Sequence, residues 1–351
     1  MPEKRRQTDL LMSVRRGVRN LLRWIEDHLQ IHVFPRDRIL SAVSTDGVIW
    51  HREPGIRVDV GGEHGSEMVY WPHVFRFPEV LRMYFTGSVR TGRGWNERIL
   101  SAVSADGLAW EVEPGERVSP GDELDRFFVS APCVARISGG YRMYYAGSGE
   151  GKKNWVILSA VSGDGLSWRK EKGVRLTPLE GFADSVNAPC LVPAENGWRM
   201  YFSSSKGYRV WIDSAVSEDG LDWRHEPGPC LGLSRTGPRV CVCHPSVVAL
   251  ADRKYRMYFT GHDGCALGAR IYSAISSDGL NWKVEGENLN YSGPFEGAEV
   301  NYVQVVEVKP SLWRMYYTGF WGKHLLLPQT YRHWKRQAYR IRKELQHESK
   351  S

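Results

Sequence analysis

Short runs of apolar and β-branched residues follow one another along most of the chain, separated by Gly-rich turns. A representative stretch has such runs at 129–134, 141–145 and 156–161, followed by Asp164-Gly165 and Trp168. Runs of this length and composition predict β-strands, and an Asp-Gly pair between two strands favours a tight hairpin turn. The stretch therefore predicts four antiparallel strands, with the Asp-Gly turn joining the third strand to the fourth.

This pattern occurs five times in the sequence. One motif, Ser-x-Asp-Gly-x-x-Trp, has its aspartates at Asp46, Asp106, Asp164, Asp219 and Asp278. A second motif, Arg-Met-Tyr, begins at Arg82, Arg142, Arg199, Arg256 and Arg314. Five similar units of four strands are typical of a β-propeller, so the predicted fold class is all-β and the predicted architecture is a five-bladed β-propeller.

The order of the two motifs predicts how the propeller closes. The first Asp-Gly motif has no Arg-Met-Tyr strand before it, and the last Arg-Met-Tyr strand has no Asp-Gly motif after it. We expect strands from residues 38–58 to pair with strands from about 299–320 and complete the last blade, which removes the exposed edges of an incomplete ring. An open solenoid is the alternative, and it would not need complementary half-units.

Two predicted helices flank the propeller, so the chain divides into residues 1–37, 38–320 and 321–351. Residues 8–30 place apolar side chains at steps of three and four with arginines between them, and residues 330–347 form a second basic helix. An amphipathic basic helix of this kind docks on the propeller, on a second subunit or on a membrane surface. A homo-oligomer and a peripheral membrane contact are the two partner hypotheses for these segments.

Composition and charge narrow the class of protein. The 351 residues are 42% hydrophobic and 25% charged, which is ordinary for a soluble globular protein, and six cysteines are too few for a disulfide scaffold. The absence of a long apolar run leads us to expect a cytoplasmic protein. The net charge of +7 comes from the two tails, because the middle of the chain is slightly acidic. We therefore expect no nucleic-acid binding through the propeller.

A feature present in all five units is best explained by packing, so a ligand site should lie where the units differ. The innermost strands align on one position per unit, which we call the anchor: Pro72, Pro132, Pro189, Pro245 and Val303. The residue three places before the anchor is valine in every unit. Two places earlier the residues vary, and by strand alternation they share one face. They predict a cavity for a small-molecule ligand in the central funnel, with these candidate binding residues: Tyr70, Ser130, Asn187, Cys243 and Asn301, together with His244 and His262.

The combination of a Tyr-Arg-Met-Tyr-Tyr strand with a Ser-x-Asp-Gly-Leu-x-Trp hairpin resembles the five-bladed propeller glycosidases. This superfamily includes the arabinanase and xylosidase type, the invertase and levansucrase type, and the mannoside phosphorylases. The resemblance covers about residues 38–320. It implies a sugar bound in the axial funnel and two or three carboxylates on the innermost strands. Glycoside hydrolysis needs such a pair, about 5 Å apart for retention and about 6.5–9.5 Å apart for inversion.

The sequence departs from this superfamily at the catalytic positions. Many of the enzymes have Asp directly before the anchor or Glu two places before it, whereas this chain has Trp71, Ala131, Ala188, His244 and Tyr302 in the first position and no acid in the second. Acids occur slightly earlier in the sequence. The candidate catalytic carboxylates are Asp184 and Glu299, which are best placed, and then Glu67 and Asp125.

Three functions remain open at this point. The first is a carbohydrate-active enzyme, a glycoside hydrolase or phosphorylase, that uses a carboxylate pair. The second is a lyase, cyclase or dehydratase that uses Cys243, His244 and His262. The third is a non-catalytic binding or assembly propeller, which a funnel plugged by Phe128, Tyr70 and Trp71 would favour. Cys241-Val242-Cys243-His244 also has donor types that suit zinc, but the spacing is weak support; we assign no metal ligand and leave the cofactor open.

Overall fold

The computed structural model describes residues 36–321, apart from 92–93, 150–153, 208, 233–240, 251, 263–267, 292–295 and 297–298. The described residues form strands, turns and bends and contain no helix, in agreement with the predicted all-β class. Both predicted helices, 8–30 and 330–347, lie outside the described residues. In the part of the chain that the structure describes, no helix has the length and apolar character needed to cross a membrane.

Antiparallel pairing groups the 20 described strands in five sets of four. Single parallel bridges, between Glu97 and Phe128 and between Val210 and Cys241, join four of these sets into two eight-stranded sheets. The first set in chain order is β3 (Met68–Arg76), β4 (Leu81–Thr91), β5 (Gly94–Ser104) and β6 (Glu111–Val112). The second set is β7 (Phe128–Ile137), β8 (Gly140–Ser148), β9 (Val156–Ser162) and β10 (Arg169–Lys170). The third set is β11 (Ser185–Ala194), β12 (Gly197–Lys206), β13 (Arg209–Ser217) and β14 (Arg224–His225). The fourth set is β15 (Cys241–Ala249), β16 (Tyr255–His262), β17 (Arg270–Ser276) and β18 (Lys283–Leu289). The fifth combines the two ends of the described chain: β19 (Val300–Lys309), β20 (Leu312–Trp321), β1 (Arg36–Ser44) and β2 (His51–Arg52).

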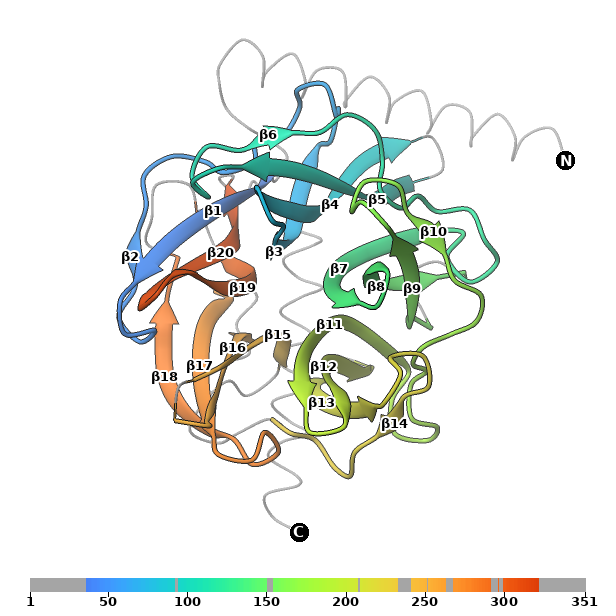
Figure 1. Ribbon diagram of the computed structural model, residues 1–351, viewed down its shortest axis with the longest axis vertical. Helices are drawn as coiled ribbons and strands as arrows, with labels where there is room; N and C mark the ends of the chain where they lie inside the picture. The colour runs from blue at the N-terminus through green and yellow to red at the C-terminus, as the bar shows by residue number, and fades with distance from the viewer. Residues whose placement is uncertain are drawn as a thin grey trace, which may run out of the picture.

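The pairing of β1 with β20 joins the two ends of the described chain. The two strands are antiparallel along their full lengths, from Arg36 opposite Trp321 to Ser44 opposite Trp313. This is the pairing that the complementary half-units predict. Figure 1 shows the five sets around a common centre, with the first strand of each set innermost. The inner strands contact one another in the order β3, β7, β11, β15 and β19, and β19 also contacts β3.

Side chains on the inner strands link each set to the next through backbone N–H groups. The residue after each anchor accepts a hydrogen bond from an N–H on the neighbouring inner strand. The acceptor and donor pairs are Gln304 with Val74, His73 with Val134, Cys133 with Leu191, Cys190 with Val247, and Ser246 with Val305. Burial lowers the pKa of His73 to about 4, so the imidazole stays neutral and its Nε2 accepts the hydrogen bond from Val134 N.

The repeated Asp-Gly turns are structural, as the sequence predicts. In the second set, one carboxylate oxygen of Asp164 accepts hydrogen bonds from the N–H groups of Leu166 and Ser167, both at 2.8 Å. These bonds lower the pKa of Asp164 to about 2. The other four aspartates accept the same pair of bonds. The turns follow the third strand of each set, so they lie at the end of the sheets opposite the start of the inner strands.

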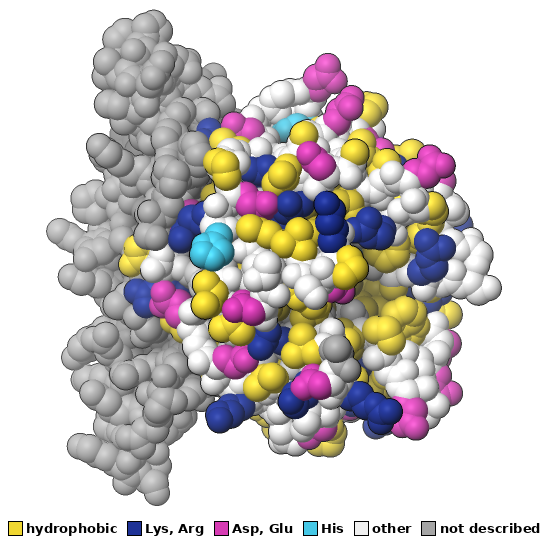
Figure 2. Space-filling view, turned by 60° about the vertical axis from the view of Figure 1, so that its left-hand side comes forward, with side chains coloured by type: hydrophobic (Ala, Val, Ile, Leu, Met, Phe, Trp, Pro, Cys, Tyr) yellow, Lys and Arg dark blue, Asp and Glu magenta, His cyan; other side chains and the backbone are white. Residues whose placement is uncertain are grey.

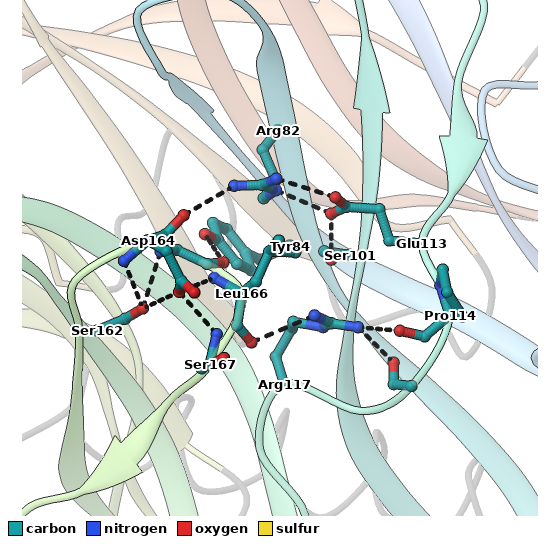
Figure 3. A network of polar contacts seen from close by, with 12 residues as sticks. Arg82, Tyr84, Ser101, Glu113, Pro114, Arg117, Ser162, Asp164, Leu166 and Ser167 are labelled. Atoms are coloured by element: carbon teal, nitrogen blue, oxygen red, sulfur yellow. Dashed lines mark hydrogen bonds and ion pairs between the residues drawn. The ribbon is translucent and has the colours of Figure 1, made fainter.

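The repeated Arg-Met-Tyr strands hold neighbouring sets together through the contacts drawn in Figure 3. Arg82 makes two hydrogen bonds to the Glu113 carboxylate of its own set, at 2.8 and 2.9 Å. It also donates to the backbone carbonyl of Asp164 in the next set. The hydroxyl of Tyr84 donates to the carbonyl of Gly165 at 2.7 Å. We call this group of contacts the latch.

Equivalent latches occur at all five arginines, including Arg314 at the junction of the chain ends. Arg314 binds Glu53 of its own set and the carbonyl of Asp106 in the next set. The motif tryptophans complete each contact between sets, because each ring meets a latch tyrosine edge-on. The centroid separations are 5.6–5.7 Å for Trp50 with Tyr258, Trp110 with Tyr316, Trp168 with Tyr84, Trp223 with Tyr144, and Trp282 with Tyr201.

The apolar core lies within and between the sets. The five valines three places before the anchors are all at most 1% exposed, as the repeat predicts for a packing position: Val69, Val129, Val186, Val242 and Val300. Acidic and basic side chains are intermixed on the described part of the face in Figure 2. This mixture fits the near balance of charge in the middle of the sequence.

Candidate functional site

Each inner strand has a bulge at its anchor, and the bulges shape the centre of the molecule. The residue before every anchor has a positive φ between 51° and 55°, and the register with the second strand shifts at that point. These residues are Trp71, Ala131, Ala188, His244 and Tyr302. Non-glycine residues rarely adopt this conformation, and its recurrence at five equivalent positions indicates that the surrounding structure imposes it.

The bulges line an axial cavity of about 110 Å³. Its walls come from all five inner strands, from the residue before each anchor to about two residues after it. Three rings of the lining pack together, because Tyr302 lies 4.6 Å from Trp71 and from His244 between ring centroids. Tyr70, which is outside the lining, lies 5.5 Å from Tyr302. Burial lowers the pKa of His244 to about 3, and its Nδ1 lies 3.0 Å from Asn301 Oδ1. The site therefore has an apolar aromatic surface with a neutral imidazole beside it.

Three carboxylates gather near the hydroxyl of Tyr302, and we call Asp37, Glu97 and Glu299 the acidic cluster. Burial, reinforced by electrostatic interaction with these acids, raises the pKa of Tyr302 well above its usual range. Burial, together with repulsion from Glu299, raises the pKa of Asp37 to about 8. Burial also raises the pKa of Glu299 to about 7. At neutral pH the pair of Asp37 and Glu299 therefore retains at least one proton.

The members of the acidic cluster differ in their partners. The Tyr70 hydroxyl hydrogen-bonds Glu97, which is 8% exposed. Among the described residues, no ion pair or side-chain hydrogen bond joins Asp37 or Glu299 to another group. Asp37 is buried and Glu299 is half-buried. Carboxyl groups withdrawn from water are normally paired, so two without partners among the described residues, beside an aromatic surface, mark a candidate site for a ligand that carries hydroxyl groups.

Several residues predicted from the sequence lie together here. Glu299 is in the acidic cluster, and Tyr70 and His244 belong to the aromatic group. Asn301 contacts His244, and Cys243 lies near enough to Glu299 for the two to interact electrostatically. These five predicted residues are on β3, β15 and β19 or, for Glu299, directly before β19.

The other candidate carboxylates occupy different surroundings. Asp125 is fully buried, where its oxygens accept hydrogen bonds from the Tyr145 hydroxyl at 3.0 Å and bind Lys170 at 2.7 Å. Asp184 is exposed and accepts a hydrogen bond from the N–H of Gly207, and Glu67 is half-buried and accepts one from the N–H of Arg90. Each of these three acids thus has protein partners, in contrast to Asp37 and Glu299.

Two more predicted binding residues and an aromatic pair lie on or near β7 and β11. Ser130 is fully buried, and neither its Oγ nor the Oδ1 of Asn187 has a hydrogen-bond partner within the described part of the chain. Phe128 stacks on Trp155 with a centroid separation of 5.6 Å and an interplanar angle of 15°.

The cysteine and histidine residues form a thiol-rich patch on β15. The Sγ atoms of Cys241 and Cys243 lie 3.3 Å apart, and Cys243 Sγ lies 3.3 Å from His244 Nδ1. His262 is opposite Cys241 on β16. In the described ranges, no three His, Cys, Asp or Glu side chains are arranged to hold a metal ion.

Sequence reasoning missed Asp37 and Glu97 because it searched for carboxylates only around the inner strands. Both are on the third strand of their sets, two places before an isoleucine that recurs in all five units. An alignment of the third strands could have found them. The five aligned residues are Asp37, Glu97, Trp155, Val210 and Ala269, so the position is acidic in two units and apolar in three.

Comparisons with known proteins show which sequences and which folds the chain resembles. No protein-family model matches the chain. Two uncharacterized proteins of Mycobacterium tuberculosis, MT1551 and Rv1502, are each 32% identical to it over 178 residues. That match spans 49% of this chain and 59% of each relative.

Solved structures of glycoside hydrolases resemble the chain over most of its length. A glycoside hydrolase gives a TM-score of 0.61 at 14% identity, covering 74% of this chain and 89% of that protein. A thermostable family-43 glycoside hydrolase gives 0.55 at 16% identity, covering 72% and 88%. The sucrose-6-phosphate hydrolase of Lactobacillus gasseri gives 0.54 at 14% identity, covering 68% and 51%. The chain therefore shares its fold with these glycoside hydrolases, in agreement with the fold that its repeated motifs predict.

Proposed function

We propose that this protein is a carbohydrate-active enzyme that cleaves a glycosidic bond, by hydrolysis or phosphorolysis, in the axial funnel of a closed five-bladed propeller. The observation that carries the proposal is the pair of carboxyl groups of Asp37, which is buried, and Glu299, which is half-buried, beside the aromatic surface of Trp71 and Tyr302; neither has a side-chain partner among the described residues. Glycoside chemistry uses two carboxyl groups of this kind, one protonated and one ionised.

Ring closure supports the proposal because it brings Asp37 into the site. Residue 37 precedes the first complete unit, and it reaches the centre only because β1 pairs with β20. The latch at Arg314 and the hydrogen bond from Val74 N to Gln304 repeat, at this junction, the contacts found between the other sets. We therefore infer that the junction is equivalent to the other four boundaries of a five-bladed ring.

The two carboxyl groups take different roles in this mechanism. Asp37 has the higher pKa and keeps its proton at neutral pH, so it is the general acid that protonates the leaving oxygen. Glu299 has a pKa of about 7 and serves, when ionised, as the base that activates the acceptor or as the nucleophile. The sugar ring stacks on the aromatic surface, and its hydroxyl groups bind the polar atoms of Ser130 and Asn187.

A turnover assay tests the proposal. The protein is incubated with a panel of aryl glycosides and plant and bacterial polysaccharides, with and without phosphate, and products are measured by mass spectrometry. Asp37→Asn and Glu299→Gln should each lower turnover at least ~10²-fold with the fold retained. Asp184→Asn is the matched control: its carboxylate is exposed, and we expect full activity. A loss confined to Asp184→Asn would contradict the assignment of the pair.

A second candidate function is sugar binding without catalysis. The observation in its favour is that aromatic residues, Trp71 and Tyr302, stand in two of the positions where many propeller glycosidases carry an acid, and their rings pack together at the centre. This reading predicts saturable sugar binding by calorimetry together with no product from any substrate. Binding that Glu299→Gln leaves unchanged would favour it over the enzyme.

A further inference from the structure

The hydrogen bonds around Asn301 fix which nitrogen of the His244 imidazole carries a proton. The backbone N–H of Tyr302 donates to Asn301 Oδ1 at 3.0 Å, and the Nδ1 atom of His244 lies 3.0 Å from the same atom. A backbone N–H can only donate, which identifies the amide atom as the oxygen, and an amide oxygen can only accept. The contact with His244 therefore needs a proton on Nδ1. Because burial lowers the pKa of His244 to about 3, the imidazole is neutral and Nε2 carries a lone pair without a proton.

The Nε2 atom of His244 is left as an acceptor at the axial cavity. The imidazole belongs to the cavity lining, and no described residue forms a hydrogen bond with Nε2. The indole N–H of Trp71, whose ring centroid is 5.6 Å from that of His244, is a buried donor with no partner within the described ranges. This part of the lining thus has one acceptor and one donor that the described protein groups do not use.

Several contacts hold the imidazole in one orientation. The backbone N–H of His244 donates to Ser203 Oγ at 2.9 Å, which ties the bulge of β15 to β12. The ring packs against Tyr302, with 4.6 Å between centroids, and Cys243 Sγ lies 3.3 Å from Nδ1. Recognition through a single nitrogen needs a ring that is fixed by its neighbours, and this ring has neighbours on three inner strands.

We propose that His244 Nε2 accepts a hydrogen bond from a hydroxyl group of the sugar, a role that rests on the proposed function, and that Asn301 is the positioning residue that holds the imidazole in this tautomer. A hydroxyl group suits this wall because it can donate to Nε2 and can also accept from a donor such as the indole N–H of Trp71. An ionised carboxylate has no proton to donate, so its lone pairs would face that of Nε2. The site therefore selects a neutral, hydroxyl-bearing sugar at this position.

The tautomer is tested on the full-length protein without a ligand. The protein is labelled with ¹⁵N in the histidine rings, and a long-range ¹H–¹⁵N spectrum is recorded at pH 7. The chain has 11 histidines, so the signals of His244 are identified as those missing from the spectrum of His244→Phe. We expect Nε2, which correlates with both carbon-bound ring protons, to be the unprotonated nitrogen. A proton on Nε2, or on both nitrogens, would overturn the proposal.

Two variants test the positioning role of Asn301. Asn301→Ala removes the acceptor of the Nδ1 proton, and it should move part of the His244 population to the tautomer with a proton on Nε2. Asn187→Ala is the matched control: it removes the amide at the equivalent position of the third set and should leave the His244 signals unchanged. Circular dichroism checks that both variants fold. An unchanged tautomer in folded Asn301→Ala would show that Asn301 does not position the ring.

Binding is tested with glucose, galactose, mannose, xylose and arabinose, each added separately to the labelled protein. The sugar that binds most tightly should shift the Nε2 signal of His244 upfield, as acceptance of a hydrogen bond does, and should leave Nδ1 nearly unchanged. His244→Phe keeps an aromatic ring without the acceptor, and it should weaken binding of that sugar about 10-fold. The proposal is wrong if none of the five sugars shifts Nε2, or if His244→Phe binds as tightly as the wild type.

The same measurements separate this proposal from the proposed function. A shift of Nε2 on sugar binding, with no turnover of any substrate, would leave the hydrogen bond in place and remove only the catalytic step. Turnover of a sugar substrate by a protein whose Nε2 signal does not respond to that substrate's sugar would retain the enzyme and overturn the role of His244.

Discussion

Replacing Asp37 by asparagine should change how the stability of the protein depends on pH. The raised pKa values of Asp37 and Glu299 mean that the folded protein holds protons that the unfolded chain has already lost above about pH 5. The free energy of unfolding must then fall as pH rises toward 8, because the unfolded state binds fewer protons than the folded state. Asparagine keeps the shape of the side chain and removes the titration.

The window from pH 6.5 to 8 isolates this effect. The buried imidazoles of His73 and His244 have folded pKa values of about 4 and 3, so they lower the free energy of unfolding mainly below pH 6.5. Below that pH their effect nearly cancels the change in the free energy of unfolding that comes from Asp37 and Glu299. At about 1.4 kcal/mol per pH unit, Asp37 contributes a loss of about 1.6 kcal/mol over this window and Glu299 about 0.8. The two histidines oppose this loss by about 0.4 kcal/mol each, so the wild type should lose about 1.6 kcal/mol in all.

Urea unfolding followed by tryptophan fluorescence at pH 6.5, 7.25 and 8 measures this loss. The free energy of unfolding of Asp37→Asn should change by no more than about 0.5 kcal/mol over the window, because only Glu299 then opposes the histidines. Asp184→Asn, which removes an exposed carboxylate, should follow the wild type. If the free energy of unfolding of the wild type is constant or rises from pH 6.5 to 8, the pKa of Asp37 is not raised in the folded protein.

Three further predictions concern the scaffold. Asp106→Ala should lower the free energy of unfolding by about 1 kcal/mol, by analogy with the loss of a helix cap, and should leave any intrinsic activity unchanged. Lost turnover at an unchanged melting temperature would mean that the turn belongs to the functional site. Two substitutions compare the junction of the chain ends with a boundary between complete sets: Arg314→Met and Arg142→Met. Each should lower the free energy of unfolding in urea by about 2 kcal/mol. A much smaller loss for Arg314→Met would mean that the junction is weaker than the other boundary. Deleting residues 1–58 removes β1 and β2 and exposes the edge of β20, so gel filtration should show aggregation that deletion of 1–30 does not cause; a monomeric, cooperatively folding 59–351 fragment would contradict this.

The repeated parts of the fold could be predicted from the sequence because one physical constraint acts five times. Each of the five Asp-Gly turns needs a capping carboxylate and a glycine that accepts a positive φ, so the same two residue types recur. The pairing of β1 with β20 follows from counting which motif each end of the chain lacks. The position three before each anchor is valine throughout because it is buried in every unit.

The site could be predicted only in part, since its residues occur once and come from different strands. Glu299 was found because it is acidic where sister units are apolar on the inner strand. Asp37 obeys the same rule on a third strand, but that strand reaches the centre only near its first residues, which sequence periodicity does not reveal. The left-handed conformations of Trp71 and Tyr302 could not be predicted either, because these residue types do not favour positive φ.

The location of a bound sugar tests the central claim most directly. Crystals of the protein soaked with glucose, galactose, mannose, xylose and arabinose would show where a monosaccharide binds. The account predicts a ring against Trp71 and Tyr302, with hydroxyl groups about 2.6–3.2 Å from the carboxyl oxygens of both Asp37 and Glu299. A sugar bound only away from these two carboxyl groups, with the axial cavity filled by water, would contradict it.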